Sequence, residues 1–207
     1  VTKSTNAITN TTGTTLVRKI NDGTLVMNVA NSYTGGTTFD AGVIRLTNTA
    51  GFGIAGQALD FNGGALVLAT DASVNAYNTT IGGSVSIFSD RATTGPGIVH
   101  TLGTLSIGNS TLFSYLGLNV DDGLGGLTFG ATTFTAATPV FDVSNGGMNV
   151  ILGALSGNFA FNKAGGGQLT LNTASARTGG TATLQDGVMR LGNASALGTA
   201  AVPLQLN

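Results

Sequence analysis

One five-residue unit, Gly-x-apolar-x-apolar, recurs along nearly the whole chain and constrains its fold more than any other feature. The residue between the two apolar positions is often polar, as in Ile44-Arg45-Leu46, and this alternation is typical of a strand with one buried face. One such strand cannot bury its face within its own coil, but stacked coils share a core. The unit begins at nine regularly spaced glycines: Gly23, Gly42, Gly64, Gly83, Gly103, Gly125, Gly146, Gly167 and Gly187. The spacing predicts an all-β, single-stranded parallel β-helix (a solenoid) with about 20 residues per coil.

We expect residues 1–207 to form one continuous β-helix segment of about nine to ten coils, wound in the right-handed sense. The alternative is an antiparallel sandwich or barrel, because hairpins also repeat at about this spacing. Composition favours strands in both cases. Only 8% of the residues are charged, against about 25% in a typical domain, and all nine acidic residues are Asp. Long helices stabilised by ion pairs are therefore disfavoured.

The same composition disfavours several classes of function. The chain has no Cys, which removes disulfides, thiolate ligands and a Cys nucleophile. A net charge of −1 gives no electrostatic footprint for nucleic acid, and no apolar run approaches the roughly 18 residues of a membrane helix. Residues 51–56 match the dinucleotide fingerprint by letter, but the residues after them indicate strand and turn, not the helix that such a site requires. We therefore expect no cofactor, no nucleic-acid partner and no membrane span in this chain.

Nothing in the sequence assembles a catalytic centre. His100, the only histidine, lies in an apolar segment, and we interpret it as a partly exposed strand residue. Solenoid enzymes usually carry long loops beside their groove, whereas the even spacing of the unit predicts no coil longer than the intervals between its glycines. The two most loop-like stretches, 90–97 and 108–123, both fit within an ordinary coil. We therefore predict no catalytic residue and expect that the chain is not an enzyme.

A ladder of charged residues is the strongest candidate for a site. Asp121, Asp142 and Lys163 each lie four residues before a glycine of the unit, so an unbroken register would stack them about 5 Å apart on successive coils. Stacked carboxylates would suit Ca²⁺ or an acid/base pair acting on a sugar. The alternative is a surface ladder in which Lys163 relieves the repulsion between the two carboxylates. We favour the surface ladder and assign no metal site.

Two stretches of the chain, 17–62 and 161–207, are similar beyond the five-residue unit. The first contains the segment Asn31-x-Tyr33-Thr34-Gly35-x-Thr37, and the second repeats its last part as Thr178-Gly179-x-Thr181. This pattern resembles the autotransporter-associated β-strand repeat, which occurs in β-helical passenger domains of Gram-negative autotransporters and related surface proteins. The second copy has Arg177 where this repeat usually has Tyr, so we expect that corner to pack differently.

The resemblance implies export and display on the outer face of a Gram-negative bacterium. It implies a structural or adhesive segment that forms a rod, stalk or fibre, whose partners would be further coils, other copies stacked end to end, carbohydrate or a host-cell surface. The alternative is a carbohydrate-binding or carbohydrate-active passenger with its site near Asp121 and Asp142 or outside this chain. Since residues 1–15 are polar and do not resemble a signal peptide, we expect the chain to be a piece of a longer protein.

Overall fold

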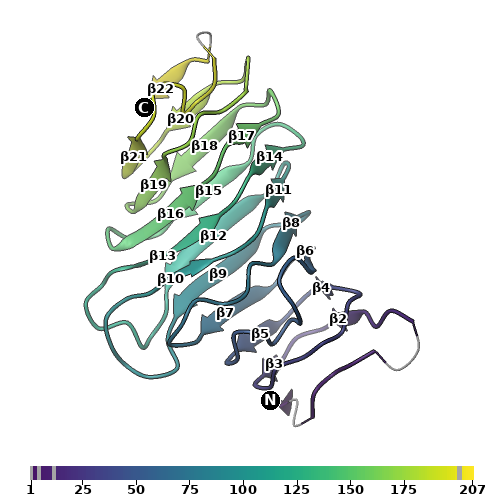
Figure 1. The fold of residues 1–207 in the computed structure, drawn as a ribbon. Helices are drawn as coiled ribbons and strands as arrows, with labels where there is room; N and C mark the ends of the chain where they lie inside the picture. Colours follow the sequence, from purple (N-terminus) through teal and green to yellow (C-terminus); the bar gives the residue numbers. More distant parts are fainter. Residues whose placement is uncertain (1, 4–5, 11–12, 200–201) are drawn as a thin grey trace.

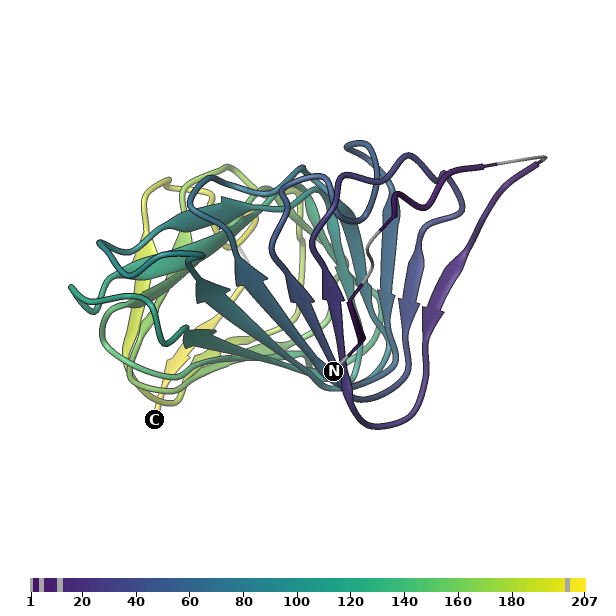
Figure 2. The same ribbon diagram turned by 90° about the horizontal axis from the view of Figure 1, so that it is seen from below.

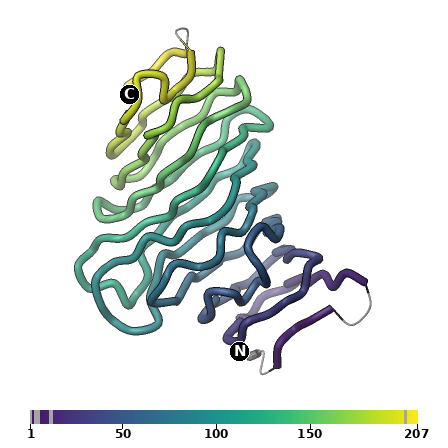
Figure 3. The backbone as a smooth tube through the Cα atoms, in the orientation of Figure 1, coloured from purple at the N-terminus to yellow at the C-terminus, as the bar shows by residue number. Residues whose placement is uncertain are grey.

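The chain winds in successive laps around one axis (Figures 1 and 3). The computed structural model describes residues 2–3, 6–10, 13–199 and 202–207. Every strand pairing among these residues is parallel. The fold is a β-solenoid of about nine turns with roughly 22 residues per turn. The predicted parallel β-helix is therefore confirmed, and the antiparallel alternative is wrong.

The strands form three sheets that run along the solenoid. The ten-stranded sheet contains, in spatial order, β1 (Thr2–Lys3), β3 (Thr24–Met27), β5 (Val43–Leu46), β7 (Ala65–Ala69), β9 (Val85–Asp90), β12 (Thr111–Leu116), β15 (Val140–Val143), β18 (Phe161–Ala164), β20 (Ala182–Leu184) and β22 (Leu204–Leu206). The seven-stranded sheet contains β2 (Val17–Lys19), β4 (Thr37–Phe39), β6 (Ala58–Phe61), β8 (Asn78–Ile81), β11 (Leu105–Ile107), β14 (Thr132–Phe134) and β17 (Leu155–Ser156). The five-stranded sheet contains β10 (Val99–Thr101), β13 (Gly125–Phe129), β16 (Met148–Leu152), β19 (Gln168–Leu171) and β21 (Val188–Leu191). The described part of the chain has no helix of the length and apolarity needed to cross a bilayer.

The sheets used by the coils change along the axis. The first coils alternate between the seven-stranded and ten-stranded sheets, and a loop closes each lap. The central coils place a strand in all three sheets, and the last coils alternate between the ten-stranded and five-stranded sheets. The five-residue unit consequently moves from sheet to sheet: it forms β3, β5, β7 and β9 in the ten-stranded sheet, then β11, and then β13, β16, β19 and β21 in the five-stranded sheet.

Two central coils are longer than the spacing of the unit predicts. Most register partners in the ten-stranded sheet are separated by about 20 residues, as Leu25 and Ile44 are. Ile87 instead pairs with Ser114, and Ser114 pairs with Val143, so each of these two laps is longer by several residues. The expectation that no coil exceeds the spacing of the unit is therefore wrong, because glycines on different sheets do not measure one full lap. The additional residues form wide turns, which stand out in teal in Figures 2 and 3.

The apolar positions of the unit form a continuous core, as the alternation predicts. Fifteen of these eighteen side chains are buried, with at most 1% of their surface exposed. The other three, Leu25, Met189 and Leu191, lie in β3 and β21 near the two ends of the solenoid, and Leu191 is 41% exposed. Met189 and Leu191 lie on β21, which is the last strand of the five-stranded sheet and has a neighbouring rung on one side only.

Candidate functional site at the enlarged corner

The two wide turns meet at the corner between the ten-stranded and five-stranded sheets. We call residues 91–98, which join β9 to β10, and residues 117–124, which join β12 to β13, the enlarged corner. The two turns are joined through Gly95, whose N–H donates to the carbonyl of Asn119 at 3.0 Å and whose carbonyl accepts from the N–H of Asp121 at 3.1 Å. Because their backbone groups bond to each other, the turns form one structural unit.

Two carboxylates hold the enlarged corner: Asp71 fastens it to the preceding coil, and Asp122 joins its two turns. Asp71 accepts hydrogen bonds from Thr93 and pairs with Arg91 at 3.2 Å, and the Thr93 N–H is the main cause that lowers the pKa of Asp71. Asp122 accepts from the N–H groups of Leu124 and Gly97, both at 2.9 Å, and these bonds lower its pKa in the same way. Both acids therefore remain ionised and hold their turns closed.

An ion pair between the buried Asp90 and the partly exposed Arg45 lies beneath the corner. Asp90 is 2% exposed, and its carboxylate accepts from Arg45 Nη1 at 3.1 Å and from the Asn119 N–H at 3.0 Å. The turn passes directly over this carboxylate at Gly117, where a Cβ atom would lie 2.1 Å from the Cβ of Asp90. A glycine at this position is therefore what allows the turn to close over the ion pair.

An apolar pocket of about 240 Å³ opens beside this ion pair. Arg45, Val67 and Phe88 occupy consecutive rungs and line it together with Asp90 and residues 116–118. The pocket is lined mainly by aliphatic and aromatic side chains, and its one cationic group is neutralised by Asp90. Such a site suits an apolar group that carries a neutral hydrogen-bond acceptor.

His100 lies next to the ion pair, in strand β10 as expected, but it is fully buried, so the expectation that it is partly exposed is wrong. In β10 the flanking residues Val99 and Thr101 face outward, and the alternation turns His100 into the core. Its Nε2 lies 3.0 Å from the carbonyl oxygen of Asp90, and its Nδ1 has no hydrogen-bond partner within the described residues. Burial lowers the pKa of His100, which favours the neutral ring.

The structure does not assemble the predicted ladder of Asp121, Asp142 and Lys163. Asp121 lies in the turn 117–124, outside any strand. Asp142 and Lys163 lie on the paired strands β15 and β18, but the register places Ala164 opposite Asp142 and leaves the Lys163 side chain inside the solenoid. The described residues contain no group of three or more acidic or histidine side chains that could hold a metal ion.

The buried Lys163 and its counterpart in the first copy, Lys19, stabilise corners of the backbone. Lys163 Nζ donates to the carbonyls of Ala164, Gly165 and Asp186. Lys19 Nζ donates to the equivalent carbonyls, those of Ile20, Asn21 and Ala41.

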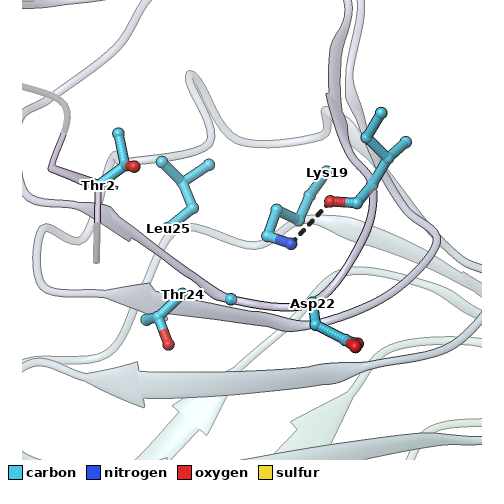
Figure 4. Close-up of a pocket in the computed structure, with 7 residues that line it drawn as sticks. Thr2, Lys19, Asp22, Thr24 and Leu25 are labelled. Atoms are coloured by element: carbon cyan, nitrogen blue, oxygen red, sulfur yellow. Dashed lines mark hydrogen bonds between the residues drawn. The ribbon is translucent and has the colours of Figure 1, made fainter.

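Lys19 also lines a pocket of about 320 Å³ at the N-terminal end of the solenoid, shown in Figure 4 with Thr2, Asp22, Thr24 and Leu25. The same lysine is fully buried in the second copy, where a further coil packs beneath it. We therefore attribute the space beside Lys19 to its position on the edge strand β2 of the seven-stranded sheet and do not treat it as a ligand site.

Residues 51–56, which match the dinucleotide fingerprint by letter, form a loop between β5 and β6. Phe52 within this loop is buried and packs edge-on against Tyr77, with ring centroids 5.4 Å apart. Strand β6 follows the loop, so the helix N-terminus that would bind a pyrophosphate is not formed.

The sequence patterns did not single out Arg45, Phe88 or Leu118 as site residues. The segment between residues 99 and 116 does indicate that a coil here has more strands than its neighbours. Three apolar segments follow one another at short spacing, and they occupy three different sides of one coil. The glycine-rich segment 93–97 marks one of the two turns that this coil needs.

Comparison with known proteins agrees with this architecture. Residues 17–46 and 161–191 match the model of the passenger-associated-transport-repeat, and these ranges contain β2–β5 and β18–β21. The chain is 33% identical over 166 residues to the adhesin BmaC autotransporter of Brucella suis biovar 1 (strain 1330); the match covers 74% of this chain and 4% of that protein. No solved structure gave a significant match.

The fold and the two matched ranges together define a β-solenoid of the passenger type. The chain is a protein of autotransporter passenger repeats, and this confirms the family that the sequence pattern indicated. The homology implies an exported surface protein of a Gram-negative bacterium. The chain spans only a small fraction, 4%, of the length of the curated relative that it matches.

Proposed function

We propose that this chain is a non-catalytic, rod-shaped segment of a surface-displayed passenger, and that it serves as a stalk with adhesive faces. The observation that carries the proposal is the pair of passenger repeats near the two ends of one continuous parallel solenoid. Nine turns at about 4.8 Å per turn give a length on the order of 45 Å. The similarity to an autotransporter adhesin supports an adhesive role.

The adhesive faces would be the outward positions of the strands, where residues such as Thr80, Thr128 and Thr133 alternate with the core. Hydroxyl and amide groups on a flat sheet make weak, repeated hydrogen bonds, which gain strength when many copies act together. Carbohydrate and host-cell surfaces are the partners that this chemistry favours, and further coils are the neighbours expected along the axis.

The proposal is tested in bacteria that display the whole passenger. We expect antibodies against residues 17–191 to label intact cells, and an in-frame deletion of these residues to reduce adhesion to host cells while the rest of the passenger remains on the surface. An intact chain that is found only inside cells, or a deletion that leaves adhesion unchanged, contradicts the proposal. A polysaccharide depolymerisation assay on the purified chain tests the catalytic alternative, for which we expect no product.

A further inference from the structure

The most exposed large apolar side chain of the described residues lies on the rim of the apolar pocket. Leu118 is 100% exposed, near the start of the turn 117–124, which is fastened by the hydrogen bonds of Asn119 and Asp122. A single exposed leucine on a protein surface is ordinary. Leu118 differs because the turn holds it next to a pocket that no side chain of the described residues fills.

The pocket has the size and the chemistry to hold a leucine side chain. A cavity of about 150 Å³ lined by Leu, Ile and Phe is enough to bind a benzene ring, and this pocket measures about 240 Å³. Its walls are the side chains of Val67, Phe88 and Leu116. Arg45 donates through Nη1 to the Asp90 carboxylate, and its side chain is 35% exposed. Other N–H groups of the guanidinium can therefore donate to an acceptor at the mouth of the pocket. Since Asp90 neutralises the charge, a neutral peptide carbonyl is preferred to an anion.

We propose that the enlarged corner is a contact surface between two copies of this chain, in which Leu118 of each copy enters the pocket of the other. A projecting side chain and a pocket that lie side by side on one surface are self-complementary, which is the requirement for a two-fold symmetric interface. The peptide carbonyls that flank Leu118 supply the neutral acceptor for Arg45 of the facing copy. The surface lies on the side of the rod, so two rods pair laterally and the solenoid ends stay free for other coils. This inference goes beyond the proposed stalk and adhesive role and does not depend on it.

The test measures the oligomeric state of the purified 207-residue chain by sedimentation velocity across a wide range of concentrations. We expect a concentration-dependent dimer for the natural sequence. Leu118→Asp should weaken the dimer by about a hundredfold or more, because two leucine side chains lose their burial at about 1.5–3 kcal/mol each. Val67→Phe, which enlarges one wall of the pocket and fills part of its space, should weaken the dimer as well, and Leu118→Met should retain it. Circular dichroism and thermal melting establish that each variant is folded.

Ile54→Asp is the matched control, because Ile54 is also exposed (56%) but lies in the loop between β5 and β6, away from the pocket. It should dimerise like the natural chain. A natural chain that stays monomeric at every concentration, or a folded Leu118→Asp variant that dimerises normally, overturns the proposal. Monomeric chain that binds a leucine-containing peptide through the pocket also overturns it, in favour of a different protein partner.

Discussion

Arg177 occupies the position in the second copy of the repeat that Tyr33 occupies in the first, and both side chains are fully buried. The Tyr33 hydroxyl is hydrogen-bonded to the hydroxyl of Thr37. The Arg177 guanidinium instead lies 5.2 Å from each of two ring centroids, those of Phe134 and Phe161. It also donates to five backbone carbonyls, those of Gly157, Phe159, Gly179, Gly180 and Leu197. The expectation that this corner packs differently is therefore confirmed.

Replacing Arg177 should destabilise the solenoid strongly. Arg177→Met fills much of the same volume but leaves the carbonyls that it serves without donors, at a cost of about 3 kcal/mol. The measurement is the shift of the urea midpoint of the purified chain. Arg190→Met is the control, because Arg190 is exposed on β21 and its loss should change stability by less than about 0.5 kcal/mol. Equal midpoints for the two variants would show that the buried guanidinium does not stabilise this corner.

Two inward-facing serines should respond to Ala substitution in opposite directions. Ser114 lies between Ile87 and Val143 in a row of core residues, and its buried hydroxyl has no hydrogen-bond partner within the described residues. Ser89 is equally buried, but its hydroxyl donates to the carbonyl of Ile98 at 2.9 Å. We expect Ser114→Ala to raise the unfolding free energy by about 1 kcal/mol and Ser89→Ala to lower it by about as much. Denaturant unfolding monitored by circular dichroism checks both, and a destabilised Ser114→Ala variant would contradict the prediction.

Gly42 is a glycine at the start of a five-residue unit whose backbone and close surroundings both exclude a side chain. Its φ angle is +78°, and a Cβ atom would lie 2.6 Å from the carbonyl oxygens of both Asn21 and Gly23 on the preceding coil. Gly42→Ala should therefore cost about 2 kcal/mol or more, through backbone strain and displacement of the neighbouring coil. Gly146→Ala is the matched control, because a Cβ atom on Gly146 would meet no other atom within 4 Å and its backbone is not in the left-handed region. Thermal melting of both variants tests this, and similar melting temperatures would refute it.

The sequence predicts the winding and the core because both depend on local features. Alternation along each unit decides which side chains face inward, as for Ile44 and Leu46, and the spacing requires stacking. The sheet that each unit joins is decided by how many strands the intervening coil contains. The unit at Gly125 looks like the unit at Gly83, yet it belongs to a different sheet. The regular spacing of the glycines therefore gives no indication of the two wide turns that lie between these units.

The charged ladder failed for a related reason. Asp142 and Lys163 lie at the same distance from a glycine of the unit, but their strands differ in phase. Asp142 faces outward in β15, whereas Lys163 faces inward in β18 beside Phe161. Counting residues back from a glycine does not determine whether a side chain on the preceding strand faces inward or outward. The corner between that strand and the glycine differs in length from coil to coil. The site at the enlarged corner could not be predicted because it depends on contacts between residues that are distant in sequence, such as Arg45 and Asp90. A local sequence pattern does not indicate such contacts.

The stability of the chain should fall as the pH drops below about 6.5 because of His100. Burial lowers the pKa of this ring from its ordinary value of 6.5, so the unfolded chain takes up the proton before the folded chain does. The stabilisation is fully present above pH 6.5 and is lost as the pH falls toward the pKa of the folded state. The pKa values of Asp71 and Asp122 are lowered from 3.8, so loss of their stabilisation begins only at more acidic pH. Urea midpoints at about pH 7.5 and pH 5 measure the effect, and a His100→Gln variant should show a much smaller difference between them. A natural chain whose midpoint is unchanged over this interval would show that His100 is protonated as readily inside the solenoid as in the unfolded state.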